Sequence, residues 1–164
     1  MKILSLSLLV LLAFSTANAA ARLDITCNFE DCGHAGWSEV VWGGNYRSDT
    51  DCKDGDCFQN GWLLRDNYGN QVQAVCKTGG CWVAGWNDTQ WVNGRVEQED
   101  VTCNNNDCLA NGWSTTTTWG ETRHISCGNS DCAHSGWTTL ATHNSITMCK
   151  MSDCFRYGWT TDVY

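Results

Sequence analysis

Apolar and polar positions alternate along this chain in short segments that are separated by glycine- and asparagine-rich turns. Residues 37–42 (WSEVVW) and 113–119 (WSTTTTW) are rich in β-branched and aromatic side chains, which is typical of strands. Turn residues such as Gly43-Gly44 and Asn93-Gly94 follow, and a second short strand leads to the next cysteine. Each segment therefore predicts a β-hairpin. No stretch after residue 20 has a 3.6-residue apolar period, so we expect no helix there.

One motif, C-x4-C-x3-G-W, joins these hairpins and occurs six times without any change in length. The connectors from each of its tryptophans to the next cysteine hold 14, 13, 16, 13 and 11 residues. The fixed part, which we call the cassette, should build a shared core, whereas the variable connectors should form surface loops. The Gly-Trp pairs are Gly36-Trp37, Gly61-Trp62, Gly85-Trp86, Gly112-Trp113, Gly136-Trp137 and Gly158-Trp159.

The N-terminus has the layout of a secretory signal peptide. Lys2 precedes an apolar run from Ile3 to Phe14, and small residues end at Ala17-Asn18-Ala19. The run is too short to span a bilayer, which needs about 20 residues, so an uncleaved anchor is the weaker alternative. We predict a signal peptide at residues 1–19 and a single secreted, extracellular domain at 20–164.

Export determines how the twelve cysteines are interpreted, because an oxidising compartment favours disulfides over metal ligation. Zinc sites of paired cysteines are the alternative that the spacing alone allows. Since the separation within each pair never changes, a local bond in every cassette is the simplest connectivity. The predicted disulfides are Cys27–Cys32, Cys52–Cys57, Cys76–Cys81, Cys103–Cys108, Cys127–Cys132 and Cys149–Cys154.

An aspartate precedes the second cysteine in five cassettes, and Gly80 stands at that position in the third. An aspartate side chain accepts hydrogen bonds from nearby backbone amides in turns, and glycine adopts the same turn without help. Calcium binding would need several oxygen ligands to converge. We therefore expect a turn-capping role for Asp31, Asp56, Asp107, Asp131 and Asp153.

The repeat defines an all-β fold of six tandem disulfide-stapled β-hairpins. Two arrangements are open, a closed ring related to a propeller or trefoil and an open β-solenoid-like array. The open array is favoured because the repeat spacings do not alternate, as a three-fold arrangement would require. Residues 23–26 and 160–163 are each half a hairpin, and they pair either with each other or with a neighbouring molecule.

Charge and missing motifs narrow the functional classes. The chain carries a formal net charge of −8, and removal of Lys2 makes it −9. Nucleic acid and anionic membrane surfaces are repelled at long range, so we predict no nucleic-acid partner and no membrane insertion. No nucleophile elbow, zinc-protease helix or phosphate loop is present. The sequence predicts a non-enzymatic protein without a cofactor or metal.

Aromatic residues near the predicted hairpin tips indicate a binding function. Trp42, Trp91 and Trp119 follow a Gly-Trp tryptophan by five or six residues, and Tyr46 and Tyr68 lie in similar places. We predict that these five residues bind a glycan or another cell-surface or cell-wall ligand.

The spacing of the Gly-Trp hairpins resembles that of bacterial cell-wall-binding modules, although those modules lack cysteine pairs. The resemblance implies stacked hairpins with aromatic ligand sites between repeats. The alternative function is a structural protein of a filament or matrix, which assembles head to tail through its terminal strands.

Overall fold

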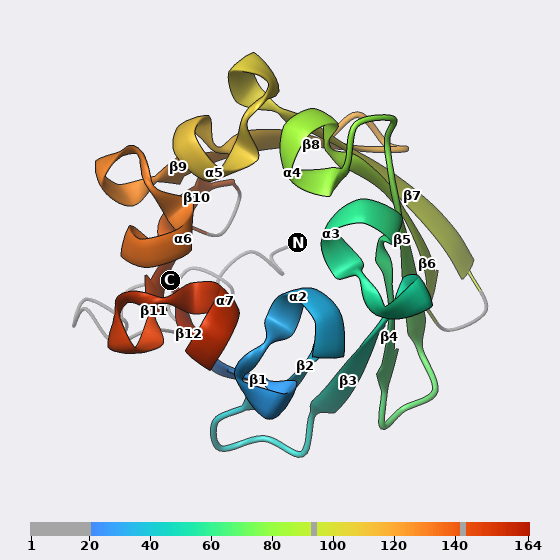
Figure 1. Cartoon of the computed structure of the whole chain (residues 1–164). Helices are drawn as coiled ribbons and strands as arrows, with labels where there is room; N and C mark the ends of the chain where they lie inside the picture. Colours follow the sequence, from blue (N-terminus) through green and yellow to red (C-terminus); the bar gives the residue numbers. More distant parts are fainter. Residues whose placement is uncertain (1–20, 93–94, 142–143) are drawn as a thin grey trace, which may run out of the picture.

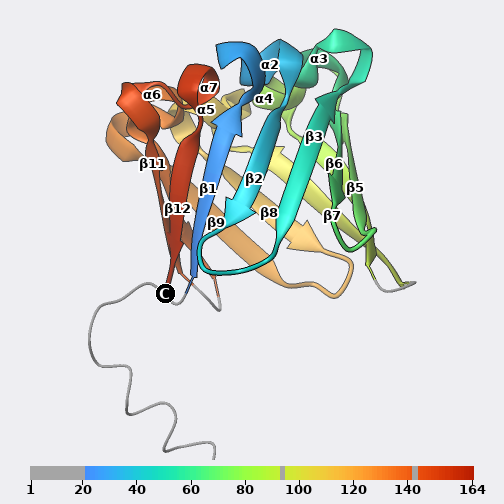
Figure 2. The ribbon, with the colours of Figure 1, turned by 90° about the horizontal axis from the view of Figure 1, so that it is seen from below.

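The computed structural model describes residues 21–92, 95–141 and 144–164, so the predicted signal peptide at 1–19 lies outside the described residues. The described strands form one closed antiparallel barrel, and each consecutive pair joined by a connector is a hairpin. Short helices form a ring at one end of the barrel (Figure 1), and the hairpin turns lie at the opposite end (Figure 2). The predicted hairpins are therefore confirmed.

The twelve strands have the following bounds: β1 (Ala21–Cys27), β2 (Trp37–Val41), β3 (Arg47–Cys52), β4 (Trp62–Asp66), β5 (Gln71–Cys76), β6 (Trp86–Val92), β7 (Arg95–Cys103), β8 (Trp113–Thr117), β9 (Thr122–Cys127), β10 (Trp137–Leu140), β11 (Ser145–Cys149) and β12 (Trp159–Val163). The single-turn helices are α2 (Cys32–Ala35), α3 (Cys57–Asn60), α4 (Cys81–Ala84), α5 (Cys108–Asn111), α6 (Cys132–Ser135) and α7 (Cys154–Tyr157). Five of the cassettes also contain a 3-10 turn directly after the first cysteine: Asn28–Glu30, Lys53–Gly55, Asn104–Asn106, Gly128–Ser130 and Lys150–Ser152.

The expectation of an open array is wrong, because the two terminal strands pair with each other. Strand β1 lies antiparallel to β12, with Ala21 opposite Val163 and Ile25 opposite Trp159. A single barrel of six equivalent hairpins needs no alternation of roles, so the even spacings are compatible with closure. Both terminal strands have two neighbours in the described structure, which removes the free edges on which the head-to-tail hypothesis depended.

The expectation of no helix is also wrong, but only within the cassettes. Each cassette contains one helical turn of four residues that starts at its second cysteine. A single turn is too short to produce an apolar period. In the five cassettes that contain it, the aspartate side chain accepts a hydrogen bond from a backbone N–H of this turn, as between Asp107 and Ala110 at 2.9 Å. The predicted capping role is confirmed.

All six predicted disulfides are confirmed, and each closes its own cassette. The Cα atoms of each pair lie 4.4–4.6 Å apart. The backbone N–H after the first cysteine donates to the carbonyl of the Gly-Trp glycine in every copy, as from Asn104 to Gly112 at 3.0 Å. Six disulfides are typical of an extracellular or otherwise oxidising environment. Among the described residues, no helix is long and apolar enough to cross a membrane.

The six Gly-Trp tryptophans form a closed ring inside the barrel. Neighbouring ring centroids lie 5.3–6.1 Å apart from Trp37 around to Trp159, which in turn contacts Trp37. This tilted geometry is favourable for aromatic pairs. Opposite each tryptophan lies the residue two before a cysteine, and all six of these positions are buried, including Thr50 and Thr147, which interrupt the apolar pattern of the sequence.

A second aromatic group closes the barrel axis at the helical end. Phe58, Trp82 and Phe155 follow the second cysteine of cassettes two, three and six, and their ring centroids lie 5.1–5.6 Å apart. Gly33 fills the same cassette position in repeat one, where a Cβ would collide with the Phe58 ring. Together with the tryptophan ring, the three rings enclose an apolar cavity of about 150 Å³. We call the group of Phe58, Trp82 and Phe155 the aromatic cap.

The Gly-Trp glycines are required because the backbone of the neighbouring strand passes directly over them. Gly112 has a φ of 73°, and a Cβ there would lie far inside the contact distance of the Ile125 carbonyl oxygen. We expect Gly112→Ala to lower the free energy of unfolding by about 2–3 kcal/mol more than Gly120→Ala. Gly120 is the matched control, since it also has a positive φ of 81° but nothing lies within 4 Å of its added Cβ. Equal free energies of unfolding for the two variants, measured by urea denaturation, would contradict this explanation.

Candidate functional site

The predicted aromatic residues lie in the hairpin turns or next to them in the chain. Figure 2 shows that these turns lie at the end of the barrel opposite the helices of the cassettes. Four of the aromatic residues expose a large part of their side chains: Trp42 (68 %), Tyr68 (65 %), Trp91 (40 %) and Trp119 (79 %). They do not form one site. Trp42 and Tyr68 follow strands β2 and β4, whereas Trp91 lies on β6 and Trp119 follows β8.

The fifth residue, Tyr46, differs from the other four because it is half-buried. Its ring centroid lies 6.3 Å from that of Tyr68. Burial raises the pKa of the Tyr46 hydroxyl, and the nearby carboxylates of Glu39 and Asp66 act in the same direction. Tyr46 therefore contacts the Tyr68 ring and offers less of its own side chain to a ligand than the other four residues do.

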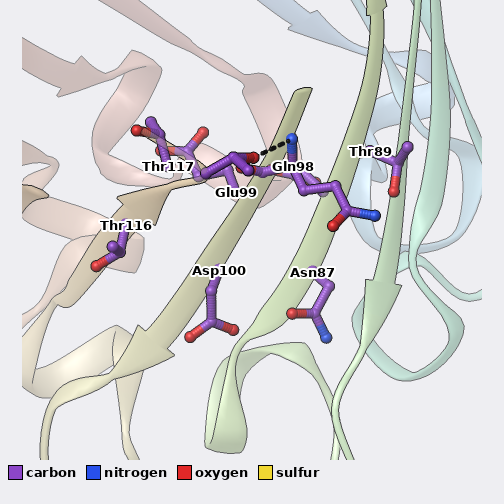
Figure 3. A pocket seen from close by; sticks show the side chains of 9 residues that line it. Asn87, Thr89, Gln98, Glu99, Asp100, Thr116 and Thr117 are labelled. Carbon is purple, nitrogen blue, oxygen red and sulfur yellow. Dashed lines mark hydrogen bonds between the residues drawn. The ribbon is translucent and has the colours of Figure 1, made fainter. Parts of the chain in front are cut away.

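Strands β6, β7 and β8 carry a polar groove of about 380 Å³. Trp86 is buried in the barrel, so the alternation of a strand places Asn87, Thr89 and Trp91 on the outer face. The register puts Asp100 between Asn87 and Thr116, and it puts Gln98 opposite Thr89. Figure 3 shows Asn87, Asp100 and Thr116 side by side on three strands, with the Gln98 side chain extended toward Thr89.

Several polar groups of this groove have no hydrogen-bond partner among the described residues, namely the side chains of Asn87, Thr89, Gln98 and Thr116. Three carboxyl groups also line the groove, those of Asp88, Glu99 and Asp100, and the last of them is paired with a lysine. Lys77 Nζ lies 2.8 Å from Asp100 Oδ1 and donates to the Thr102 hydroxyl at 2.8 Å. The groove therefore offers amides and hydroxyls to a ligand beside its carboxyl groups.

A second pocket of about 420 Å³ is lined by Arg95, Val96, Glu97 and Trp119. Val96 lies directly opposite Trp91 in the β6–β7 ladder, and Gln98 is the next residue of β7 on the same face. Val96 therefore has Trp91 as its ladder partner and shares a pocket with Trp119. We call the polar groove together with Trp91, Val96 and Trp119 the β6–β8 site.

Asp88 and Glu99 line the groove from positions whose place in the strand alternation is that of the inner face. Asp88 lies opposite Glu99 in the ladder, and its Oδ2 accepts a hydrogen bond from Trp86 Nε1 at 3.1 Å. Burial raises the pKa of Asp88 to about 7, and the charge of Glu99 adds to this shift. Burial also raises the pKa of Glu39 on β2. No group of three or more histidine, cysteine, aspartate or glutamate side chains in the described part of the chain is arranged to hold a metal ion.

The sequence did not identify the polar residues of the groove. Asn87, Gln98 and Thr116 come from three strands and have no distinctive spacing, so only their register brings them together. One local signal was present, because Asn87-Asp88-Thr89 matches the acceptor motif for N-glycosylation and Asn87 is exposed in the groove. The aromatic cap was missed for the same reason, since only half of the cassettes carry it.

Comparison of the chain with protein-family models, curated proteins and solved structures finds no match. The geometry of the barrel and its outer face is therefore the basis for inferring a function.

Proposed function

We propose that this chain is a secreted, non-enzymatic carbohydrate-binding protein whose main binding surface is the β6–β8 site. The observation that carries the proposal is the combination of two exposed tryptophans with a polar groove in which the side chains of Asn87, Thr89, Gln98 and Thr116 have no hydrogen-bond partner among the described residues. A sugar ring has an apolar C–H face and a rim of hydroxyls. Indole rings match the first, and amide and hydroxyl side chains match the second.

The electrostatics favour a neutral glycan. Asp100 is paired with Lys77 inside the groove, and the whole chain has a formal charge of −8. A polyanionic ligand would be repelled at long range, whereas an uncharged polysaccharide would not. The outward-facing positions of β6 from Asn87 to Trp91 span about 13 Å at the rise of a strand. This length suits an oligosaccharide rather than a single sugar.

Secretion is part of the proposal and is supported by two features. The first is the signal-like segment at residues 1–19, and the second is the set of six disulfides. A ligand on a cell surface or cell wall would meet the protein in that compartment.

The test is binding of neutral oligosaccharides to protein made in the bacterial periplasm, where disulfides form and Asn87 stays unmodified. We expect Trp91→Ala combined with Trp119→Ala to weaken glycan binding at least tenfold, because stacking on both rings is lost; tenfold corresponds to about 1.4 kcal/mol. Melting temperature should fall only slightly, since both side chains are exposed.

Leu140→Ala is the matched control, because Leu140 is an exposed apolar residue on the outer face of β10. Its affinity should equal that of the wild type. Isothermal titration across a panel of neutral β- and α-linked oligosaccharides gives both affinity and stoichiometry. Unchanged affinity in the double tryptophan variant would exclude the β6–β8 site as the binding surface.

A further inference from the structure

The outer face of the barrel has a second group of three strands that resembles the β6–β8 site. Repeats one and two supply β2, β3 and β4 just as repeats three and four supply β6, β7 and β8. Asp49 lies between Ser38 and Arg65 across these strands. Asp100 lies between Asn87 and Thr116 in the same way.

The backbone at the turn end is equivalent as well. The Asn67 N–H donates to the Arg47 carbonyl at 2.9 Å, and the Thr118 N–H donates to the Gln98 carbonyl at 2.9 Å. These two bonds fix the chain directly before Tyr68 and Trp119. Both aromatic residues are therefore presented from the same place in the repeat.

The flanking tryptophans match too. Trp42 follows Trp37 by five residues, as Trp91 follows Trp86. Trp42 begins the turn after β2, whereas Trp91 lies within the longer β6, so Trp42 is the more exposed of the two. Trp42 also contacts Arg22, whose guanidinium carbon lies 6.0 Å from the indole centroid.

The groove on this part of the wall has different polar groups and ends at Asn67, the residue before Tyr68. It has a volume of about 260 Å³ and is lined by residues of β3 and β4 and the turn that follows. Arg47 and Arg65 occupy the positions of Gln98 and Thr116. Arg65 pairs with Asp51 at 3.1 Å, and Asp49 accepts from the Ser38 hydroxyl at 2.7 Å. The Arg47 guanidinium has no partner among the described residues, so its N–H groups are free to donate to sugar hydroxyls.

The third pair of repeats does not carry the arrangement. Ile146 takes the place of the aspartate, between Thr138 and Asp162. The apolar Ile146 side chain cannot accept a hydrogen bond, whereas the carboxylates of Asp49 and Asp100 at the equivalent positions can. Asp24 on β1 also stands at the aspartate position, between Thr160 and Val40, but Gly43 occupies the place of Tyr68 and Trp119 there. Among the described residues, the aspartate row together with an aromatic residue at that place therefore occurs twice.

We propose that β2–β4, with Trp42 and Tyr68, is a second carbohydrate site, so that one molecule binds two glycan chains and cross-links them. This inference rests on the proposed function. The two sites are two repeats apart on the wall of one closed barrel, so they face different directions and a single short glycan cannot occupy both. Two chains held on one rigid body would convert modest single-site affinity into high avidity on a polymeric surface.

The experiment compares three variants with the wild type: Trp42→Ala with Tyr68→Ala, Trp91→Ala with Trp119→Ala, and all four substitutions together. Titration with the short neutral oligosaccharide that binds the wild type gives the number of sites per chain. Clumping of beads coated with the corresponding polysaccharide reports cross-linking. Light scattering fixes the mass of each variant, so that cross-linking by a dimer is recognised.

We expect two sites per chain in the wild type, one in each double variant and none in the fourfold variant. Only the wild type should clump the beads. One site per chain that is lost with Trp91 and Trp119, together with full binding after Trp42 and Tyr68 are replaced, would overturn the second site and leave the proposed function intact. A wild type that binds no oligosaccharide and clumps no beads would overturn both.

Discussion

Removal of residues 160–164 is expected to lower the free energy of unfolding by at least about 4 kcal/mol, a large part of the stability of an ordinary domain. Strand β12 forms a five-pair ladder with β1 and another with β11. Each ladder hydrogen bond stabilises the fold by about 1 kcal/mol. The deletion removes most of both ladders and leaves β1 and β11 with unpaired edges. Urea denaturation followed by tryptophan fluorescence measures the loss.

The truncated protein should also self-associate, because unpaired strand edges are templates for other chains. The matched control is Thr160→Ser with Asp162→Asn, which changes two outward-facing side chains of β12 and keeps its backbone. That variant should stay monomeric and lose less than about 1 kcal/mol. A truncated chain that remains monomeric and melts like the wild type would contradict closure of the barrel through β1 and β12.

Replacement of Asp88 by asparagine is expected to stabilise the protein at neutral and higher pH by about 3–4 kcal/mol, since each unit of pKa shift corresponds to about 1.4 kcal/mol. Burial raises the pKa of this carboxyl from 3.8 to about 7. The folded state therefore holds a proton that the unfolded state has already released. The contribution of the Asp88 carboxyl to the free energy of unfolding is fully present below about pH 4. It is lost as the pH rises from about 4 to 7, and it does not change further above that range. Asparagine keeps an oxygen that accepts from Trp86 Nε1 and removes the buried charge.

The measurement is the free energy of unfolding of wild type and Asp88→Asn from pH 4 to pH 9. The two curves should diverge with rising pH and run parallel above about pH 7. Glu99 faces Asp88 across the ladder and is unchanged in both proteins, so its contribution largely cancels. Asp100→Asn on the outer face is the control, with an expected change below about 1 kcal/mol. Parallel curves throughout the range would show that Asp88 is charged in the folded protein.

The local parts of this structure followed from the sequence. The cassette disulfides join residues five apart, and the aspartate caps bind amides two or three residues away. The hairpins likewise follow from strand propensity and turn residues within one connector. The exposed tip aromatics Trp91 and Trp119 were also predictable, because they depart from the repeat that defines the core. Such interactions depend on neighbours along the chain, so a single sequence contains enough information to place them.

Closure of the barrel was decided only in three dimensions. Whether β1 meets β12 depends on the twist and tilt accumulated over all the strands, and no residue of either end encodes that sum. The aromatic cap and the polar groove on β6, β7 and β8 arise in the same way. Phe58 contacts Phe155 from almost one hundred positions away, and Asn87, Asp100 and Thr116 meet through register alone. A repeat specifies each unit and its contact with the next, but the contacts across the axis and along the wall exist only after the ring has closed.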